Sequence, residues 1–203
     1  GNACFAAQCP NLKLKELQVE STDEEVIWRL KGTELRCRPP HFEVKGSNEG
    51  VSYDLKVTAT APTAWFVGDF DNLATAHIAC FDQLTVSEGV IRKGRKTYPI
   101  SRGYGTHEHP IVGSSPWLDV YSQPMHWIIG GGEELQFFTF KASHSPGGYG
   151  RVMVEGKFVS YDTGVTLTVL EEWRDPRSLI TIPSKWHINM FSPQGILDVT
   201  GAA

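Results

Sequence analysis

One segment of the chain combines proton-transfer groups with aromatic rings. His107, His109 and His126 are three of the seven histidines of the 203-residue sequence. Acidic, phenolic and indole side chains lie among and around them: Tyr104, Glu108, Trp117, Asp119, Tyr121 and Trp127. The imidazole pKa lies near neutrality, so a histidine in an apolar, aromatic-lined pocket can donate or accept a proton. The segment therefore predicts a site for acid–base chemistry.

The spacing of the histidines assigns roles within this site. If residues 106–109 are extended, His107 and His109 point to one face and Glu108 to the other, because strand side chains alternate. We predict His107 as the main acid or base, with Tyr104, Glu108 and His126 as catalytic partners. The substrate-binding residues are then predicted to be His109, Trp117, Asp119, Tyr121 and Trp127. A hydrogen-bonded structural role for His107 is the alternative.

A metal site is a second interpretation of the same histidines. Two histidines at i and i+2 on a strand, with His126 from another strand, can form an open three-ligand site. The cupin pattern would be the natural comparison, but residues 110–114 contain no glutamate ligand and no Pro-x-Gly-x-x-His motif follows. We therefore predict no metal and no cofactor.

Other catalytic signatures are missing from the sequence. It contains no Gly-x-Ser-x-Gly elbow, phosphate-binding loop, zinc-finger spacing or dinucleotide fingerprint. Residues 130–132 are three glycines that precede a β-like run, so they predict a turn. The four cysteines, Cys4, Cys9, Cys37 and Cys80, have no CxxC spacing. This pattern favours a reducing, cytoplasmic location, and leaves open whether Cys4 and Cys9 form a disulfide.

The elements that must position these groups are predicted to be β-strands. Apolar residues recur with a period of two in short runs separated by Gly, Pro, Asn or Asp, most cleanly over residues 51–59. Charged, glycine-containing turns at 92–95 and 155–156 predict hairpins. Further strands are expected over residues 26–30, 35–38, 42–45, 134–142, 164–173, 185–191 and 196–199. The longest break is 110–124, a length at which loops are often functional.

Composition sets the limits of this interpretation. Hydrophobic residues make up 40% of the chain and charged residues 21%, which is typical of a folded globular protein. The net charge of −4 gives no electrostatic argument for nucleic-acid binding. Apolar runs are far too short to cross a bilayer, so no transmembrane segment or signal peptide is predicted. We expect an all-β fold of ten to twelve strands, one antiparallel barrel or bent sandwich over residues 1–203.

The order of several short motifs resembles that of a known family. The motifs are residues 51–57, 84–89 leading to 98–100, the Gly-Tyr-x-x-His element at 103–107, and residues 132–136, 173–176 and 182–186. In this order they resemble the carotenoid 1,2-hydratase (hydroxyneurosporene synthase) and AttH-like group of lipocalin-type proteins, to which calycin-fold natural-product pericyclases are related. The resemblance covers most of the chain from about residue 28.

The resemblance implies a calycin-like fold that holds a hydrophobic polyene, terpenoid or polyketide-like molecule and works without a redox cofactor. In the hydratases a Gly-Tyr-x-Asp-His-x-Trp element assists protonation of an alkene. Here Thr106 stands at the aspartate position and His109 at the tryptophan position, while His107 is retained. The family's N-terminal strands are expected to be missing or reduced to residues 1–20. A homo- or hetero-oligomeric partner would then complete the barrel.

These observations together predict a cofactor-independent enzyme. It would bind an apolar, unsaturated small molecule in a β-lined pocket and promote isomerisation, cyclisation or hydration, as an isomerase, cyclase or hydro-lyase. A pericyclic reaction needs only a folded substrate and one donor on a carbonyl. Two alternatives remain open at this stage: a non-catalytic carrier of the same ligand class, and a structural β module completed by another chain.

Overall fold

The computed structural model describes residues 14–69, 77–112, 125–142, 148–161 and 164–202. Apart from one short 3₁₀ turn, η1 (Leu14–Glu16), every regular element in these ranges is a β-strand, and all recorded strand pairs are antiparallel. This confirms the all-β prediction. The described strands form three open sheets, however, so the closed-barrel form of the prediction is wrong for this part of the chain. The lipocalin-like assignment stays a prediction.

The first sheet, sheet A, contains eight strands in the order β1-β2-β3-β4-β5-β7-β6, with β8 also on β7. Their bounds are β1 Gln18–Ser21, β2 Val26–Leu30, β3 Thr33–Arg38, β4 His41–Asn48, β5 Val51–Ala59, β6 Ala64–Asp69, β7 His77–Lys93 and β8 Lys96–Val112. Strands β5 and β6 pair with successive halves of the long strand β7, at residues 85–93 and 77–82. Strand β7 therefore joins both β5 and β6 to the same sheet.

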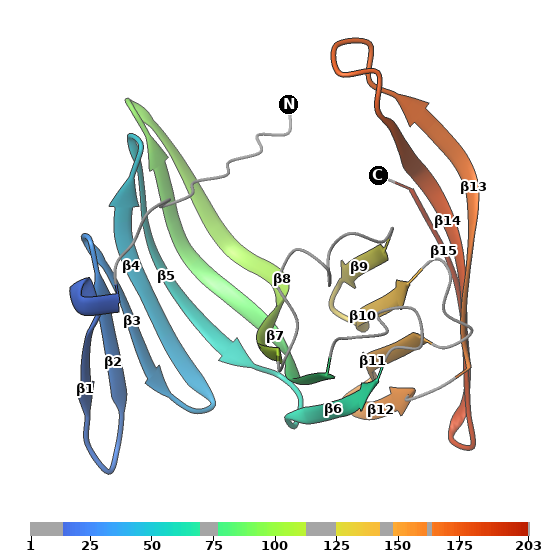
Figure 1. The fold of residues 1–203 in the computed structure, drawn as a ribbon, viewed down its shortest axis with the longest axis horizontal. Coiled ribbons are helices and arrows are strands. Elements are labelled where there is room, and N and C mark those ends of the chain that lie inside the picture. The colour runs from blue at the N-terminus through green and yellow to red at the C-terminus, as the bar shows by residue number, and fades with distance from the viewer. Residues whose placement is uncertain (1–13, 70–76, 113–124, 143–147, 162–163, 203) are drawn as a thin grey trace. The chain divides into compact units, whose positions relative to one another are not determined.

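Two compact units divide the chain. Unit 1 contains residues 1–60 and 85–105, and unit 2 contains residues 61–84 and 106–203. Unit 1 therefore carries β1–β5, coloured blue to cyan in Figure 1, with the turn-proximal parts of β7 and β8. Unit 2 carries β6, the remaining parts of β7 and β8, and all later strands. The prediction of a single domain over 1–203 stays a prediction.

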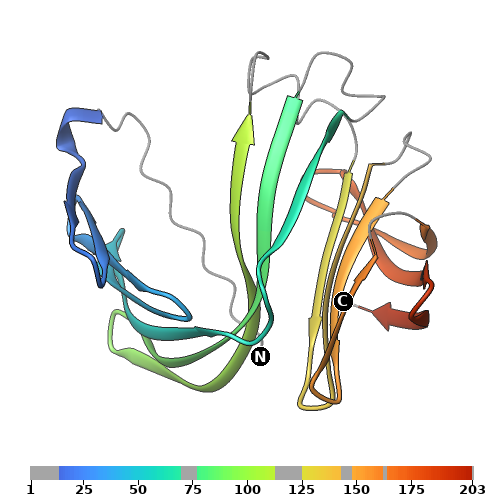
Figure 2. The ribbon, with the colours of Figure 1, turned by 90° about the horizontal axis from the view of Figure 1, so that it is seen from below.

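Unit 2 contains two further sheets that pack face to face (Figure 2). Sheet B has the order β12-β11-β10-β9, with β9 Met125–Gly131, β10 Leu135–Ala142, β11 Gly148–Val154 and β12 Lys157–Tyr161. Sheet C has the order β13-β14-β15, with β13 Val165–Arg174, β14 Thr181–Ser192 and β15 Gly195–Ala202. The core between them contains Phe137, Val152, Tyr161, Val165, Ile188 and Met190. At Gly150 a Cβ would overlap the Met190 thioether, so close packing requires glycine there.

Local sequence signals explain most of these strands. Strand β5 spans residues 51–59 as predicted, and the hairpins at 94–95 and 155–156 lie at the predicted turns. The described ranges hold fifteen strands rather than ten to twelve, because β1, β6 and β9 carry weak alternation. Strand β9 includes Gly130 and Gly131, which were predicted to form a turn. The Oγ1 atom of Thr22 accepts hydrogen bonds from the backbone N–H groups of Glu24 and Glu25. This turn leads into strand β2.

Within the ranges given above, no helix has the length and apolar character that a membrane span requires.

Candidate functional site

Strand β8 carries the acid–base residues predicted from the sequence. The strand is continuous over Lys96–Val112, so residues 106–109 are extended as expected. His107 and Glu108 are half-buried, and the Nδ1 atom of His107 is enclosed by protein. As neighbours on a strand, they project to opposite faces. His109 belongs to the same strand, but its side chain lies outside the described part of the structure.

Tyr104 lies three residues before His107 on β8. An odd spacing places two side chains on opposite faces of a regular strand, so Tyr104 and His107 point to opposite faces. Arg102 is two residues from Tyr104 and therefore shares its face. The guanidinium carbon of Arg102 lies 5.6 Å from the centroid of the Tyr104 ring. This is a cation–π contact in unit 1. The geometry gives Tyr104 a stacking partner of its own.

A second group of side chains in unit 2 lies on one face of sheet B. It consists of four aromatic rings and one cation, and we call it the aromatic–arginine face: Trp127, Phe138, Phe140, Tyr149 and Arg151. The strand register brings them together, because Phe140 pairs with Trp127 on β9 and with Tyr149 on β11. Phe138 on β10 pairs with Arg151 on β11. Strand pleating turns all five side chains to the side of sheet B away from sheet C.

The rings of this face contact one another edge to face or in tilted pairs. Trp127 lies 5.6 Å from Phe140 and 5.9 Å from Phe138, measured between ring centroids. Tyr149 lies 5.5 Å from Phe138 and 5.4 Å from Phe140. These are the preferred arrangements of aromatic rings, because the electron-poor edge of one ring meets the electron-rich face of another. The four rings form one continuous apolar cluster, in which Phe138, Phe140 and Tyr149 are buried.

Arg151 is the most informative residue of the aromatic–arginine face. Its relative exposure is 1%, and its guanidinium carbon lies 5.2 Å from the centroid of the Tyr149 ring. Its Nη1 atom donates to the carbonyl oxygens of Gly150, at 2.9 Å, and Tyr161, at 3.4 Å. An arginine stays protonated in proteins, so this site holds a positive charge shielded from water.

His126 and Lys141 lie on the opposite face of sheet B from Trp127. The two residues are cross-strand neighbours on β9 and β10. Burial lowers the pKa of the His126 imidazole and the pKa of the Lys141 ammonium, because both lose hydration of the charged form. Since His126 and Trp127 are adjacent in one strand, they project to opposite faces of sheet B. The structure therefore separates these two predicted site residues.

Part of the predicted site lies outside the described residues. Trp117, Asp119 and Tyr121 lie outside the described residues, as does the part of the predicted loop 110–124 that follows Val112. No cluster of three or more His, Cys, Asp or Glu side chains suited to a metal ion occurs among the residues that the structure describes. Because the His109 side chain is not among them, the alternative metal site of His107, His109 and His126 stays a hypothesis.

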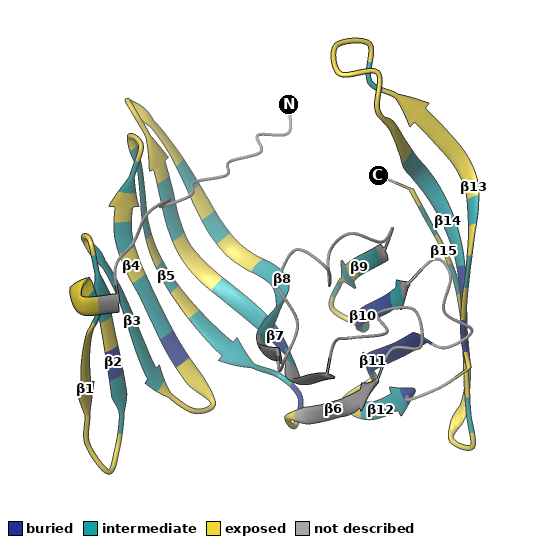
Figure 3. Ribbon diagram, viewed as in Figure 1, coloured by how far each residue is buried: buried dark blue, intermediate teal, exposed yellow. Residues whose placement is uncertain are grey.

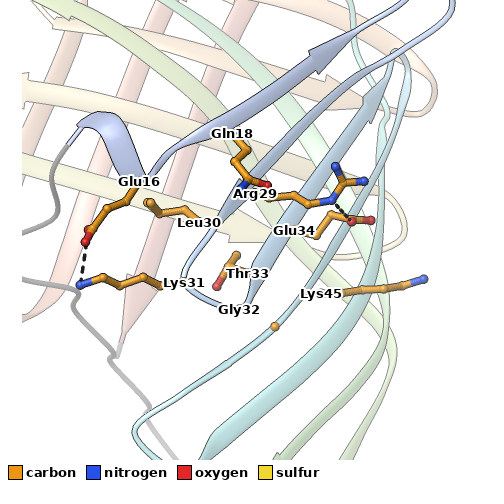
Figure 4. Close-up of a pocket in the computed structure, with 10 residues that line it drawn as sticks. Glu16, Gln18, Arg29, Leu30, Lys31, Gly32, Thr33, Glu34 and Lys45 are labelled. Atoms are coloured by element: carbon orange, nitrogen blue, oxygen red, sulfur yellow. Dashed lines mark hydrogen bonds and ion pairs between the residues drawn. The ribbon is translucent and has the colours of Figure 1, made fainter.

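Unit 1 contains a contrasting polar site. An open hollow of about 560 Å³ lies over β1–β4 and is lined by charged side chains (Figure 4). Each of its cations has a carboxylate partner. Arg29 lies 2.8 Å from Glu34, and Lys31 lies 3.6 Å from Glu16. Lys45 is paired with Glu43 at 3.1 Å. The charges of the hollow are therefore balanced internally, which weakens it as a site for a charged ligand.

Reasoning from sequence missed Arg151. The residue lies in the run Gly148-Tyr149-Gly150-Arg151-Val152, which predicts a strand and places an arginine beside apolar and aromatic positions. An isolated charge in such a run was the available signal. Its meaning depends on strand pairing, because only the register with β10 puts Arg151 among the rings.

Comparisons with known proteins give no assignment. The chain matches no protein-family model, and neither a curated protein nor a solved structure resembles it at a significant level. The function therefore has to be argued from the residues and geometry above.

Proposed function

We propose that unit 2 binds an apolar, unsaturated small molecule and promotes its isomerisation, cyclisation or hydration without a cofactor. The observation that carries the proposal is the buried guanidinium of Arg151 among the four rings of the aromatic–arginine face. The motif resemblance to the carotenoid hydratase and AttH-like proteins supports the same ligand class. In this proposal Arg151 recognises a carbonyl or carboxylate oxygen, and the rings contact the conjugated carbon skeleton.

The burial of Arg151 favours a functional role over a purely structural one. Taking a guanidinium out of water costs several kcal/mol, and an apolar side chain of the same volume often stabilises a fold as well or better. The cation–π contact with Tyr149 recovers about 2 kcal/mol at a desolvated site. A cation in a dry environment is a strong hydrogen-bond donor to a developing negative charge. That property suits activation of a conjugated carbonyl group.

The rings supply the second requirement, an apolar lining of defined shape. Phe138, Phe140 and Tyr149 are buried, while Trp127 is only half-buried. A ligand approaching this face would meet Trp127 first. Stacked rings contact a conjugated chain over its whole length and hold it in one conformer, which lowers the entropic cost of reaction.

His107 supplies proton transfer in this scheme. For hydration, its protonated ring would give a proton to one alkene carbon, and water would then add to the neighbouring cationic carbon and return a proton. For isomerisation, the imidazolium would protonate one alkene carbon, and the resulting neutral imidazole would then accept a proton from a different carbon, so that no atoms are gained or lost. Both steps need a group that titrates near neutrality. Glu108, on the opposite face of β8, would contribute through the charge of its carboxylate.

A test compares wild-type protein with His107→Ala on a panel of conjugated polyenes and polyenones. Products are read by mass spectrometry: a gain of one water marks hydration, and a new isomer of unchanged mass marks isomerisation or cyclisation. We expect His107→Ala to abolish turnover while ligand affinity stays within about tenfold of wild type. The exposed His41→Ala on β4 is the matched control and should keep full activity.

The remaining outcomes identify the alternatives. Binding without turnover by the wild-type protein would mark a carrier. Failure to bind any member of the panel would favour a structural module and overturn the proposal.

A further inference from the structure

The β13–β14 hairpin exposes several large apolar side chains at and next to its turn. Leu179 and Ile180 at the turn are 61% and 60% exposed. Trp173 and Ile182, which pair across the two strands behind it, are also exposed. The hairpin extends beyond the strands of sheet B, and its end is coloured as exposed in Figure 3. We refer to Trp173, Leu179, Ile180 and Ile182 as the hairpin tip.

The turn is held in one conformation by its own polar groups. The Asp175 carboxylate accepts hydrogen bonds from the backbone N–H groups of Arg177, at 3.1 Å, and Ser178, at 3.3 Å. The N–H of Leu179 donates to the Asp175 carbonyl at 2.8 Å, and the N–H of Asp175 donates to the Ile180 carbonyl at 2.9 Å. These donors are paired within the turn, so moving them out of water leaves them satisfied.

Leu179 occupies a backbone conformation that its side chain disfavours. Its φ of 62° lies in the left-handed region, where glycine or asparagine is the usual choice. Leucine here costs backbone energy and exposes an apolar side chain to water. A strained, exposed residue of this kind points to a function at the position.

We propose that the hairpin tip inserts into the surface of a lipid bilayer. Four half-exposed side chains offer on the order of 400 Å² of contact, about half of the roughly 800 Å² per partner that a stable protein dimer buries. A narrow tip with paired backbone donors suits entry into the headgroup and acyl boundary, with Trp173 at the level where indole rings prefer to lie.

The charges around the tip define the kind of membrane expected. Residues 171–185 contain three acidic side chains, Glu171, Glu172 and Asp175, and three basic ones, Arg174, Arg177 and Lys185. The segment is therefore electrically neutral. Insertion should depend on apolar contact and not on anionic lipid, so neutral phosphatidylcholine vesicles suffice and added salt has little effect. This inference stands whether or not unit 2 binds an apolar ligand.

The test measures cosedimentation of the full chain with phosphatidylcholine vesicles. Wild-type protein should bind, and the double variant Leu179→Asp, Ile180→Asp should bind at least tenfold more weakly. Ile196→Asp is the matched control, because Ile196 is 69% exposed but follows the β14–β15 turn at the other end of sheet C. The control should bind like wild type.

Leu179→Asn separates membrane binding from folding. Asparagine fits the left-handed conformation better than leucine, so the melting temperature should stay level or rise while vesicle binding weakens. Absence of wild-type binding, or equal binding by the double variant, would overturn the proposal. So would a wild-type dimer in sedimentation that Leu179→Asp converts to monomer, since the tip would then serve a second copy of the chain.

Discussion

Arginine is used in opposite ways in the two units. In sheet A of unit 1, Arg36 and Arg38 share the Glu25 carboxylate at 3.0 and 2.7 Å, and water reaches these side chains. In unit 2, Arg151 is shielded from water and contacts the Tyr149 ring and backbone carbonyls. Exposed, compensated pairs contribute little free energy and are screened by salt. Removing a guanidinium from water is costly, and we therefore propose the functional site in unit 2.

The largest loss of stability is expected when a buried ring of unit 2 is truncated. Phe138 has a relative exposure of 0%, so Phe138→Ala should lower the free energy of unfolding by about 3–5 kcal/mol in chemical denaturation. Phe191→Ala changes the same residue type at an exposed position of β14 and should cost much less. Equal losses for the two variants would contradict the packing described for the aromatic–arginine face.

Acid should weaken the two regions in different pH ranges. Burial lowers the pKa of His126, so the folded state stays neutral where the unfolded state is already protonated. This contribution to stability is present above about pH 6.5 and is lost as the pH falls below it. His126→Gln should flatten the melting temperature over that range, with Lys141, the neighbouring titratable group, left in place. An unchanged profile would exclude His126 as the cause.

The carboxylates of unit 1 respond at lower pH. Hydrogen bonds from Arg38 to Glu25, from Arg29 to Glu34 and from Lys45 to Glu43 lower the pKa of each carboxyl below its ordinary value. A depressed carboxyl pKa stabilises the fold above the unfolded pKa and is lost as pH falls through the folded one. Glu25→Gln should reduce the loss of melting temperature below pH 4.5. A variant that loses stability in acid as steeply as wild type would contradict this role of Glu25.

The smallest loss of stability is expected when a single ion pair is removed from the open hollow over β1–β4. Glu34→Gln removes the 2.8 Å pair with Arg29, but Arg29 keeps Glu20 at 2.6 Å. The change in melting temperature should be small and should disappear at high salt, because exposed charges are screened. A large, salt-independent loss would mean that this site behaves like the buried one and would remove the contrast.

Local sequence patterns predicted where the strands lie better than they predicted which strands pair with one another. Alternation over 51–59 gave β5 its full length, because the period of two reports which face of a strand is buried. The sharing of one β7 edge by β5 and β6 depends on long-range pairing, which no local pattern contains. The arrangement of the described strands in three open sheets has the same cause, because it too depends on long-range pairing.

The candidate site was predicted in part. Strand β8 carries His107 and Glu108 in the extended conformation that the sequence indicated. The separation of His126 from Trp127 is predictable once residues 125–131 are known to form a strand, because adjacent side chains of a strand point to opposite faces. The contribution of Arg151 required the register of β10 and β11, because burial of a charge is a property of tertiary packing.

The most direct test of the central claim is a fluorescence titration with parinaric acid, a conjugated polyene that carries a carboxylate. It compares wild type with Arg151→Met, which keeps volume and apolar packing, and with Arg38→Met, which removes an exposed arginine of unit 1. We predict that Arg151→Met keeps the melting temperature and weakens binding at least tenfold, while Arg38→Met binds like wild type. Equal affinity for all three proteins would contradict the assignment of ligand recognition to the aromatic–arginine face.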